Sequence, residues 1–308
     1  MTGHIDVHTH MIPTGYAQWL RDHGVHAPGG RELPEWSPDL ALELMGRHGI
    51  ATAILSLSTP GVHLDDGADA PALARGMNEF GAELVKDHPG RFGLFATLTL
   101  PDVDTALAEA VYALDELSAD GVILLANSRG LYLGEPSLDP LMTVLDERSA
   151  VVLVHPADLP GPAVPGIPPF AADFLLDTTR AAFNLVRHNV PRRFPGIRFI
   201  LGHAGGFVPY AAHRLALSVF AQTGRDLDEV LDDLAGFFFD TAMSASPAAL
   251  PSLLAFAKPG HVLYGSDWPF APEPAVAYFT APIQDSEDIG HHNARTLFPR
   301  LTRSSRPL

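Results

Sequence analysis

The amino-acid sequence predicts an α/β fold of the (β/α)8 TIM-barrel class, with loop insertions at the C-terminal mouth of the barrel. Eight short apolar runs alternate with helix-like segments along the 308 residues, and such alternation is typical of a parallel sheet covered by helices. Most of these runs are continuously apolar, as expected for strands buried on both faces. Several end in histidine or aspartate, at the edge where a barrel gathers its functional side chains. The length suits a one-domain barrel, so we expect a single domain over residues 1–308.

The eight candidate strands are short and separated by longer segments with helical periodicity. They span residues 4–8, 52–57, 91–98, 121–126, 151–155, 198–203, 237–240 and 261–267. One of the helical segments, residues 37–49, begins with Ser37 as a plausible N-cap and Pro38 in the first turn. Eight rounds of strand and helix favour closure into a barrel. Periodicity alone leaves a doubly wound open sheet as the alternative.

Two stretches break this alternation. Residues 11–38 are rich in proline, glycine and histidine, and residues 156–172 contain six prolines. Loops of this length in a compact domain are usually functional. Since both follow candidate strands, we expect them to cover the mouth of the barrel.

The composition excludes several classes of partner and chemistry. The formal net charge is −16, from 20 basic and 36 acidic residues, so the surface repels nucleic acid and anionic membranes. The absence of cysteine rules out disulfides and thiolate catalysis, and it restricts any metal ion to nitrogen and oxygen ligands. The N-terminal segment has no basic region followed by an apolar stretch, and no apolar run approaches membrane-spanning length, roughly 20 residues. We therefore expect a soluble, cytoplasmic protein that acts on a small molecule.

Three histidines and one aspartate follow candidate strands and form a predicted metal site. His8 ends the first strand and His10 lies two residues on, so both side chains point the same way in an extended chain. His155 ends the fifth strand and Asp267 the eighth. Each has an ordinary explanation taken alone, but together they predict one divalent ion, Zn²⁺ or alternatively Mn²⁺. Three histidines and a carboxylate with an open position suit a catalytic ion.

Further charged residues are candidates for proton transfer and substrate binding. His203 ends the sixth strand, and we assign it general acid–base work; a fourth metal ligand or a partner of Asp267 are the alternatives. Arg180 and Arg214 are candidates for clamping a substrate carboxylate. Ordinary surface salt bridges are the alternative for both.

Four ordered segments give the chain a resemblance to the amidohydrolase superfamily: HIDVHTHMIP, VVLVHPAD, FILGHAGGFVPYAAHR and YGSDWPF. The similarity runs over essentially the full length. Within the superfamily, the chain resembles the aminocarboxymuconate-semialdehyde decarboxylase branch. The segments LPEWSP, ILSLSTPGVHL, LLDTTRAAFNLV and LYLGEP are most similar to 6-methylsalicylate decarboxylases.

This resemblance implies a (β/α)8 barrel, a mononuclear Zn²⁺ or Mn²⁺ site on the four ligands above, His203 as acid–base residue, and non-oxidative decarboxylation. The position of Arg214 implies that it reaches the neighbouring subunit's site in a homodimer. A second substrate arginine of the branch would fall near residues 34–37, where this chain has Glu35 and Trp36. That departure disfavours aminocarboxymuconate semialdehyde and favours an ortho-hydroxybenzoate such as 6-methylsalicylate, with Trp36 covering its ring.

The same site chemistry leaves other functions open. A metal-dependent hydrolase of a lactone, ester or amide needs the same ligands, because the ion lowers the pKa of bound water. Hydration of an enol acid is a further alternative, and a non-catalytic metal-storage protein is one of a different kind. The reaction product separates the enzymatic alternatives, and metal content tests the last.

Overall fold

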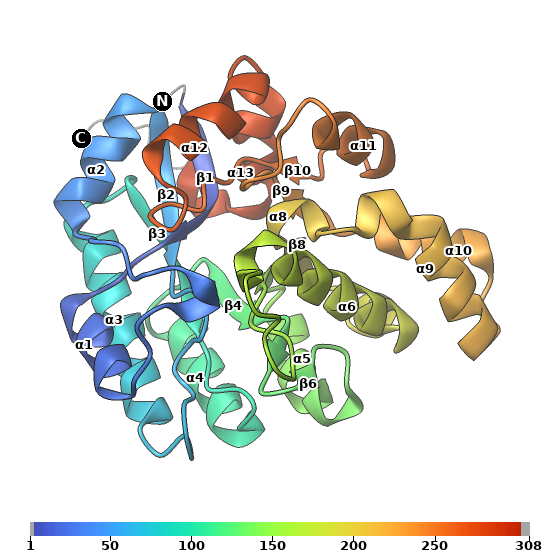
Figure 1. Cartoon of the computed structure of the whole chain (residues 1–308), viewed down its shortest axis with the longest axis horizontal. Helices are drawn as coiled ribbons and strands as arrows, with labels where there is room; N and C mark the ends of the chain where they lie inside the picture. Colours follow the sequence, from blue (N-terminus) through green and yellow to red (C-terminus); the bar gives the residue numbers. More distant parts are fainter. Residues whose placement is uncertain (1–2, 303–308) are drawn as a thin grey trace.

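The computed structural model describes residues 3–302 and contains an eight-stranded parallel barrel surrounded by helices (Figure 1). This confirms the predicted fold class. Neighbouring strands follow chain order: β1 (His4–His10), β2 (Ile50–Ser56), β3 (Phe92–Thr97), β4 (Gly121–Leu125), β7 (Val151–His155), β8 (Arg198–Leu201), β9 (Phe238–Asp240) and β10 (Val262–Leu263).

Backbone hydrogen bonds join the last strand region to the first. The Val7 amide donates to the Tyr264 carbonyl at 3.0 Å, and the His10 amide donates to the Trp268 carbonyl at 2.8 Å. These bonds close the sheet on itself, so the open doubly wound alternative is wrong.

Helices cover the outside of the barrel and cap its ends. Ser37 caps α2 as predicted, because its side chain accepts a hydrogen bond from the Leu40 amide. The helices are α1 (Thr14–Asp22), α2 (Pro38–Arg47), α3 (Ala70–Asp87), α4 (Val103–Asp115), α5 (Asp139–Glu147), α6 (Asp173–Arg187), α7 (Val190–Arg193), α8 (Gly202–Gly205), α9 (Val208–Thr223), α10 (Leu227–Ala235), α11 (Ala249–Phe256), α12 (Glu273–Thr280), α13 (Asn293–Leu297) and α14 (Pro299–Thr302). Short 3-10 turns are η1 (Pro28–Gly30), η2 (Pro136–Leu138), η3 (Pro169–Ala171) and η4 (Ala281–Ile283), and a π-helical turn is η5 (Asp288–His292).

The structure departs from the predicted elements in several places. The strand expected at 4–8 continues to His10, so His8 lies within it. The strand expected at 198–203 ends at Leu201, and the one expected at 261–267 has only two residues. A small hairpin of β5 (Asn127–Ser128) and β6 (Leu131–Tyr132) follows β4. The stretch 11–38, expected to be a loop, contains α1 and η1.

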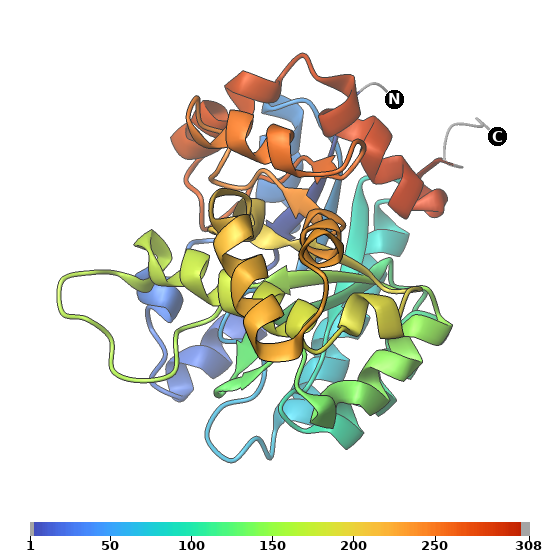
Figure 2. The same cartoon turned by 90° about the vertical axis from the view of Figure 1, so that its right-hand side faces the viewer.

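The segments 11–38 and 156–172, which interrupt the alternation of strands and helices, come together over the mouth of the barrel. Figure 2 shows residues 156–172 as the long yellow-green loop that projects from the body of the molecule. η1 and η3 pack against each other, and a Cβ atom on Gly29 would lie 2.4 Å from the Phe174 ring. Close packing at this position therefore requires glycine.

Apolar side chains fill the lower half of the barrel. Ile5, Val7, Phe95 and Phe298 belong to one buried cluster, together with Ile54, Ile123, Val151, Leu153, Ile200, Leu263, Ala294 and Leu297. Two of the helices near the C-terminus, α13 and α14, lie beside this cluster, so the floor of the barrel is closed. Within the described residues, none of the helices has the length and apolar character needed to cross a bilayer.

A one-residue register shift in β1 decides which way its histidines point. Asp6 pairs with Ala53 and Thr9 with Leu55, so three steps along β1 match two along β2. Ile5 and Val7 face the interior cluster, and strict alternation would then turn His8 and His10 outward. The extra residue restores them to the inner side. Bulges of this kind often re-aim a side chain beside an active site.

Candidate active site

The structure brings His8, His10, His155 and Asp267 together at the mouth of the barrel. One ligand atom from each lies within 4.8 Å of all the others. The two β1 histidines approach the carboxylate most closely: His8 Nε2 is 3.5 Å and His10 Nε2 is 3.3 Å from Asp267 Oδ1. All three histidines are buried, with at most 2% of their surface exposed.

Each ligand histidine uses Nδ1 for a hydrogen bond to a different kind of oxygen. His8 Nδ1 is 2.7 Å from the Asp240 carboxylate, His10 Nδ1 is 3.0 Å from Ser56 Oγ, and His155 Nδ1 is 2.7 Å from the Pro156 carbonyl. Ser56 Oγ donates its own proton to the Thr9 carbonyl, so it accepts from His10. In the neutral form of each histidine, these contacts place the ring proton on Nδ1 and leave Nε2 without a proton.

The bare nitrogens fit a metal ion. His8 Nε2 and His10 Nε2 are fully buried and have no hydrogen-bond partner in the described part of the chain. A buried polar atom without a partner is costly, and a cation removes that cost for nitrogen and carboxylate alike. The donor set therefore fits one divalent ion.

The electrostatics of the cluster disfavour competing protons on His10, His155 and Asp267. Burial, and then the neighbouring imidazoles, lower the pKa of His155 well below its ordinary value. Burial also lowers the pKa of His10. Burial alone would raise the pKa of Asp267, but contact with His10 and the other histidines holds it below its usual range. His8 differs: burial lowers its pKa, but Asp240 outweighs that effect and raises it to about 9.

His203 lies beside the four ligands in a left-handed turn just after β8. Its ring centroid is 4.8 Å from that of His8 and 5.9 Å from that of His155. His203 and Ala204 both have positive φ, 53° and 56°, which is uncommon outside glycine. His203 Nδ1 lies 3.2 Å from the Ala242 carbonyl, and burial lowers its pKa. The His203 ring is therefore neutral, and its Nε2 is available for proton exchange.

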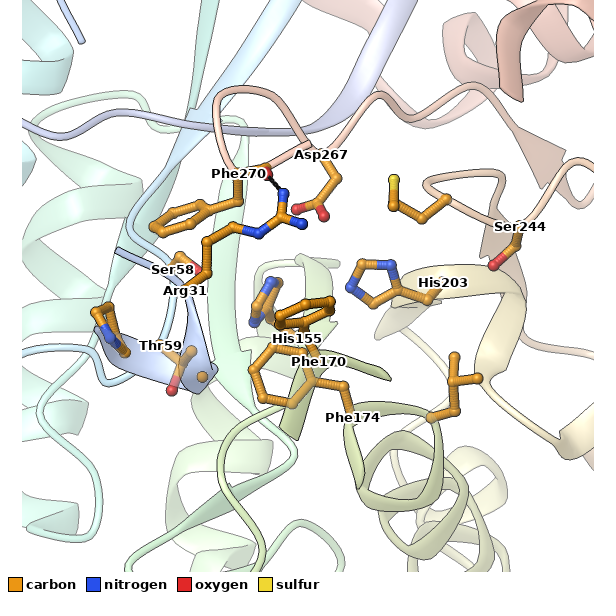
Figure 3. Close-up of a pocket in the computed structure, with 14 residues that line it drawn as sticks. Arg31, Ser58, Thr59, His155, Phe170, Phe174, His203, Ser244, Asp267 and Phe270 are labelled. Atoms are coloured by element: carbon orange, nitrogen blue, oxygen red, sulfur yellow. Dashed lines mark hydrogen bonds between the residues drawn. The ribbon is translucent and has the colours of Figure 1, made fainter. Parts of the chain in front are cut away.

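A cavity opens directly beside this cluster (Figure 3). Its empty space is about 660 Å³, with open solvent at the mouth included. His155, His203 and Asp267 line its inner wall, and the remaining lining residues are Pro28, Gly29, Arg31, Ser58, Thr59, Phe170, Phe174, Leu175, Met243, Ser244 and Phe270. Phe170 comes from the second covering segment, Phe174 from the start of α6, and Phe270 from the segment after β10.

Arg31 is a cavity residue that sequence reasoning missed. It follows η1, and Figure 3 shows its guanidinium between Phe270 and the inner wall. Nη1 donates to the Phe270 carbonyl, and the guanidinium carbon lies 4.7 Å from the centroid of the Phe170 ring. Its neighbours in the sequence, Gly29 and Gly30, were the available signal, because they permit the close packing that carries Arg31 inward.

Three predicted substrate residues lie outside the cavity lining. Trp36 is buried against Phe80 of α3, with ring centroids 6.3 Å apart. Arg180 is exposed on α6, and its Nη1 lies 3.4 Å from the Tyr132 hydroxyl. Arg214 is exposed on α9, a helix that lies at the edge of the molecule in Figure 1. In this single chain, the cavity lining includes three phenylalanines and Arg31.

Comparison with known proteins agrees with this geometry. The family model described as Amidohydrolase matches residues 5–300. The 6-methylsalicylic acid decarboxylase acuB of Aspergillus aculeatus is 37% identical over 321 residues, covering 97% of this chain and 97% of that protein. A crystal structure of an amidohydrolase II has a TM-score of 0.90 at 32% identity, covering 96% of this chain and 99% of its own.

A 2,6-dihydroxybenzoate decarboxylase solved with 2,6-dihydroxybenzoate has a TM-score of 0.77 at 25% identity, covering 97% of this chain and 100% of its own. The family match spans nearly every described residue, from the first barrel strand to the last helix. The chain belongs to the amidohydrolase family.

Proposed function

We propose that this protein is a metal-dependent, non-oxidative decarboxylase of a small ortho-hydroxybenzoate, of which 6-methylsalicylate is the leading candidate. One observation carries the proposal: a His₃Asp cluster with bare, buried nitrogens opens onto a cavity lined by phenylalanines and one arginine. The names of the relatives support the reaction, because they include decarboxylases of 6-methylsalicylic and 2,6-dihydroxybenzoic acids.

His8, His10, His155 and Asp267 would hold the ion. Zn²⁺ suits this donor set, with Mn²⁺ as the alternative. When bound, the cation supplies Lewis acidity that stabilises negative charge on the phenolate and carboxylate oxygens of such a substrate.

The cavity residues orient the substrate. Arg31 keeps Nε and Nη2 available after Nη1 has bound the Phe270 carbonyl, and guanidinium donors pair well with a carboxylate. Phe174 and Phe270 approach the ligand histidines edge-on, with ring centroids 6.3 Å from His155 and 5.6 Å from His10. An aromatic ring held among these side chains is positioned and shielded from water.

His203 and Asp267 are the proposed proton carriers. His203 takes up a proton on Nε2, so that its ring becomes an imidazolium, and passes this proton to the ring carbon that bears the carboxylate, which forms a C–H bond and interrupts aromaticity. The C–C bond to the carboxylate then breaks, CO₂ leaves, and the released electron pair restores the ring. The products are a phenol and CO₂, and the consumed proton is replaced from water.

We also propose a homodimer formed through α9. Phe207, Tyr210, Leu217 and Phe220 are 39–88% exposed, and they recur at helical spacing around Arg214. Exposed apolar patches of this kind mark interaction surfaces. In that arrangement Arg214 would approach the partner's site. A cytoplasmic location is a separate proposal, which cell fractionation would test.

Product analysis of the metal-reconstituted protein tests the reaction. We expect 6-methylsalicylate to yield CO₂ and 3-methylphenol, followed by mass, with slower turnover of other hydroxybenzoates. Lactones, esters and amides in the same panel test hydrolysis. Ring opening or ester cleavage without CO₂ release would replace the proposal with the hydrolase alternative.

A further inference from the structure

Asp240 is a buried carboxylate at the centre of the site that neither lines the cavity nor belongs to the metal-ligand cluster. It ends β9 and is 0% exposed. Oδ2 lies 2.7 Å from His8 Nδ1. Oδ1 accepts hydrogen bonds from two backbone amides, those of His203 at 2.9 Å and Ala242 at 3.0 Å. One side chain thus contacts both a predicted metal ligand and the predicted acid–base residue.

The contacts on the His203 side form a closed loop. Asp240 Oδ1 binds the Ala242 amide, the Ala242 carbonyl accepts from His203 Nδ1, and the His203 amide returns to Asp240 Oδ1. This loop spans a turn whose residues have left-handed backbone conformations. Such conformations persist where surrounding contacts over-determine them.

The contact on the His8 side fixes a tautomer. An ionised carboxylate only accepts hydrogen bonds, so Asp240 requires the proton on His8 Nδ1. His8 Nε2 is then bare and faces the other ligands. Gly265 leaves the space for this pair: a Cβ atom there would lie 2.9 Å from His8 Cβ and 3.2 Å from Asp240 Cβ.

We propose that Asp240 is a positioning residue that serves the metal and the proton carrier at once. Oδ2 prepares His8 as a ligand, and Oδ1 holds the turn that presents His203 to the cavity. The inference rests on the proposed function only for the His203 part. The His8 part concerns metal binding and is measurable without turnover.

Asp240→Asn separates the two parts. If the amide oxygen faces the His203 and Ala242 amides, its NH₂ faces His8 Nδ1, which must then accept and move its proton to Nε2. If the amide is reversed, its NH₂ faces the backbone N–H groups of His203 and Ala242. Donors then face donors, so this orientation is unfavourable. The first orientation keeps the turn intact and disables His8 as a ligand. Asp240→Ala removes both sets of contacts.

The test uses the full chain and compares wild type, Asp240→Asn, Asp240→Ala and a control, Asp233→Asn. Asp233 is also a buried carboxylate, but it accepts hydrogen bonds from Arg192 and Arg225 and lies beside Arg198 at the opposite end of the barrel. The measurements are the Zn²⁺ dissociation constant by chelator competition, the His8 tautomer by long-range ¹H–¹⁵N NMR in metal-free protein at a pH above the His8 pKa of about 9, and turnover at saturating Zn²⁺.

We expect Asp240→Asn to raise the Zn²⁺ dissociation constant by roughly 10- to 100-fold, as for other residues that orient a ligand histidine. The His8 proton should move to Nε2, and Asp233→Asn should bind Zn²⁺ like wild type. Wild-type affinity in Asp240→Asn, an unmoved proton, or an equal loss in Asp233→Asn would each overturn the His8 part.

The His203 part has its own readout. At saturating Zn²⁺, Asp240→Asn should turn over at least 10-fold faster than Asp240→Ala, because it keeps the acceptor for the His203 turn. Equal rates would overturn this part. If no protein in the series converts a hydroxybenzoate, the proposed function fails, whereas the Zn²⁺ affinities and NMR spectra still decide the role of Asp240 toward His8.

Discussion

Three histidines of the site reach the same tautomer by contacting three different acceptors: a carboxylate for His8, a hydroxyl for His10 and a backbone carbonyl for His155. Orienting partners of this kind fix ring direction as well as proton position. The predicted ligands are therefore held by residues that carry no chemistry of their own. Their loss would damage metal binding without touching a ligand.

Arg31 gives a prediction for a single residue. Arg31→Gln removes the guanidinium from the cavity wall, so a substrate carboxylate loses its charged partner. We expect KM for the hydroxybenzoate to rise roughly 10- to 100-fold, the equivalent of about 1.5–3 kcal/mol for hydrogen bonds to a charged group. Steady-state kinetics measure it.

Arg180→Gln is the matched control, because Arg180 lies on the exposed side of α6. Its KM should equal that of wild type. A larger effect at Arg180 than at Arg31 would mean that the carboxylate binds elsewhere.

The ligand residues could be predicted from sequence, whereas their partners could not. His8, His155 and Asp267 stand next to apolar runs, and barrel topology brings such positions to one edge. Arg31 lies in an irregular segment whose path depends on Phe174 and the second loop, far away in the sequence. No local pattern encodes that packing.

Among the elements, the bulge in β1 has the largest effect on the site. It inserts one residue between Asp6 and Thr9, and it lets an apolar floor and a polar mouth share the same strand. The sequence HIDVHTH alternates without a visible break, so the bulge is a product of pairing with β2. β10 is likewise shorter than the predicted strand, and Asp267 beyond its end has a φ of 61°.

The turn after β8 gives a prediction for an element. Gly206 has φ of 62°, and a Cβ atom there would lie 2.1 Å from the Leu175 carbonyl oxygen. Gly206→Ala should lower the free energy of unfolding by at least about 2 kcal/mol, from backbone strain and steric overlap together. Because the turn carries His203, turnover should fall as well. Urea unfolding and steady-state rates measure the two effects.

Gly224→Ala provides the comparison. Gly224 ends α9 with φ of 71°, but a Cβ atom there meets nothing within 4 Å. It should cost only about 1 kcal/mol and leave turnover unchanged. Equal losses for the two variants would show that the overlap with Leu175 is relieved by a small shift.

For the whole molecule, the apolar face of α9 predicts self-association. Tyr210→Glu with Leu217→Glu places two charges on that face, and we expect the double variant to be monomeric by light scattering where wild type is dimeric. Tyr278→Glu on α12 is the control, since Tyr278 is exposed but lies outside the face. A monomeric wild type at micromolar concentration would contradict the proposal.

Metal removal tests the whole molecule in another way. An ion that binds only the folded state stabilises it by about 4 kcal/mol when its concentration is 1,000 times the dissociation constant. Chelation should therefore lower Tm by several degrees, and adding Zn²⁺ should restore it. An unchanged Tm in protein shown by elemental analysis to lose its ion would argue against a site formed by the native cluster.

The packed barrel floor has a consequence for the order of events in a catalytic cycle. Phe95 and Phe298 are buried beneath the site, so the described residues close the floor and leave the cavity open at the mouth. Acid, phenol and CO₂ therefore share one mouth, whose lining includes residues of η1 and η3. Product release and substrate entry thus use the same opening. We expect the departure of the phenol to set the earliest time at which the next acid can enter.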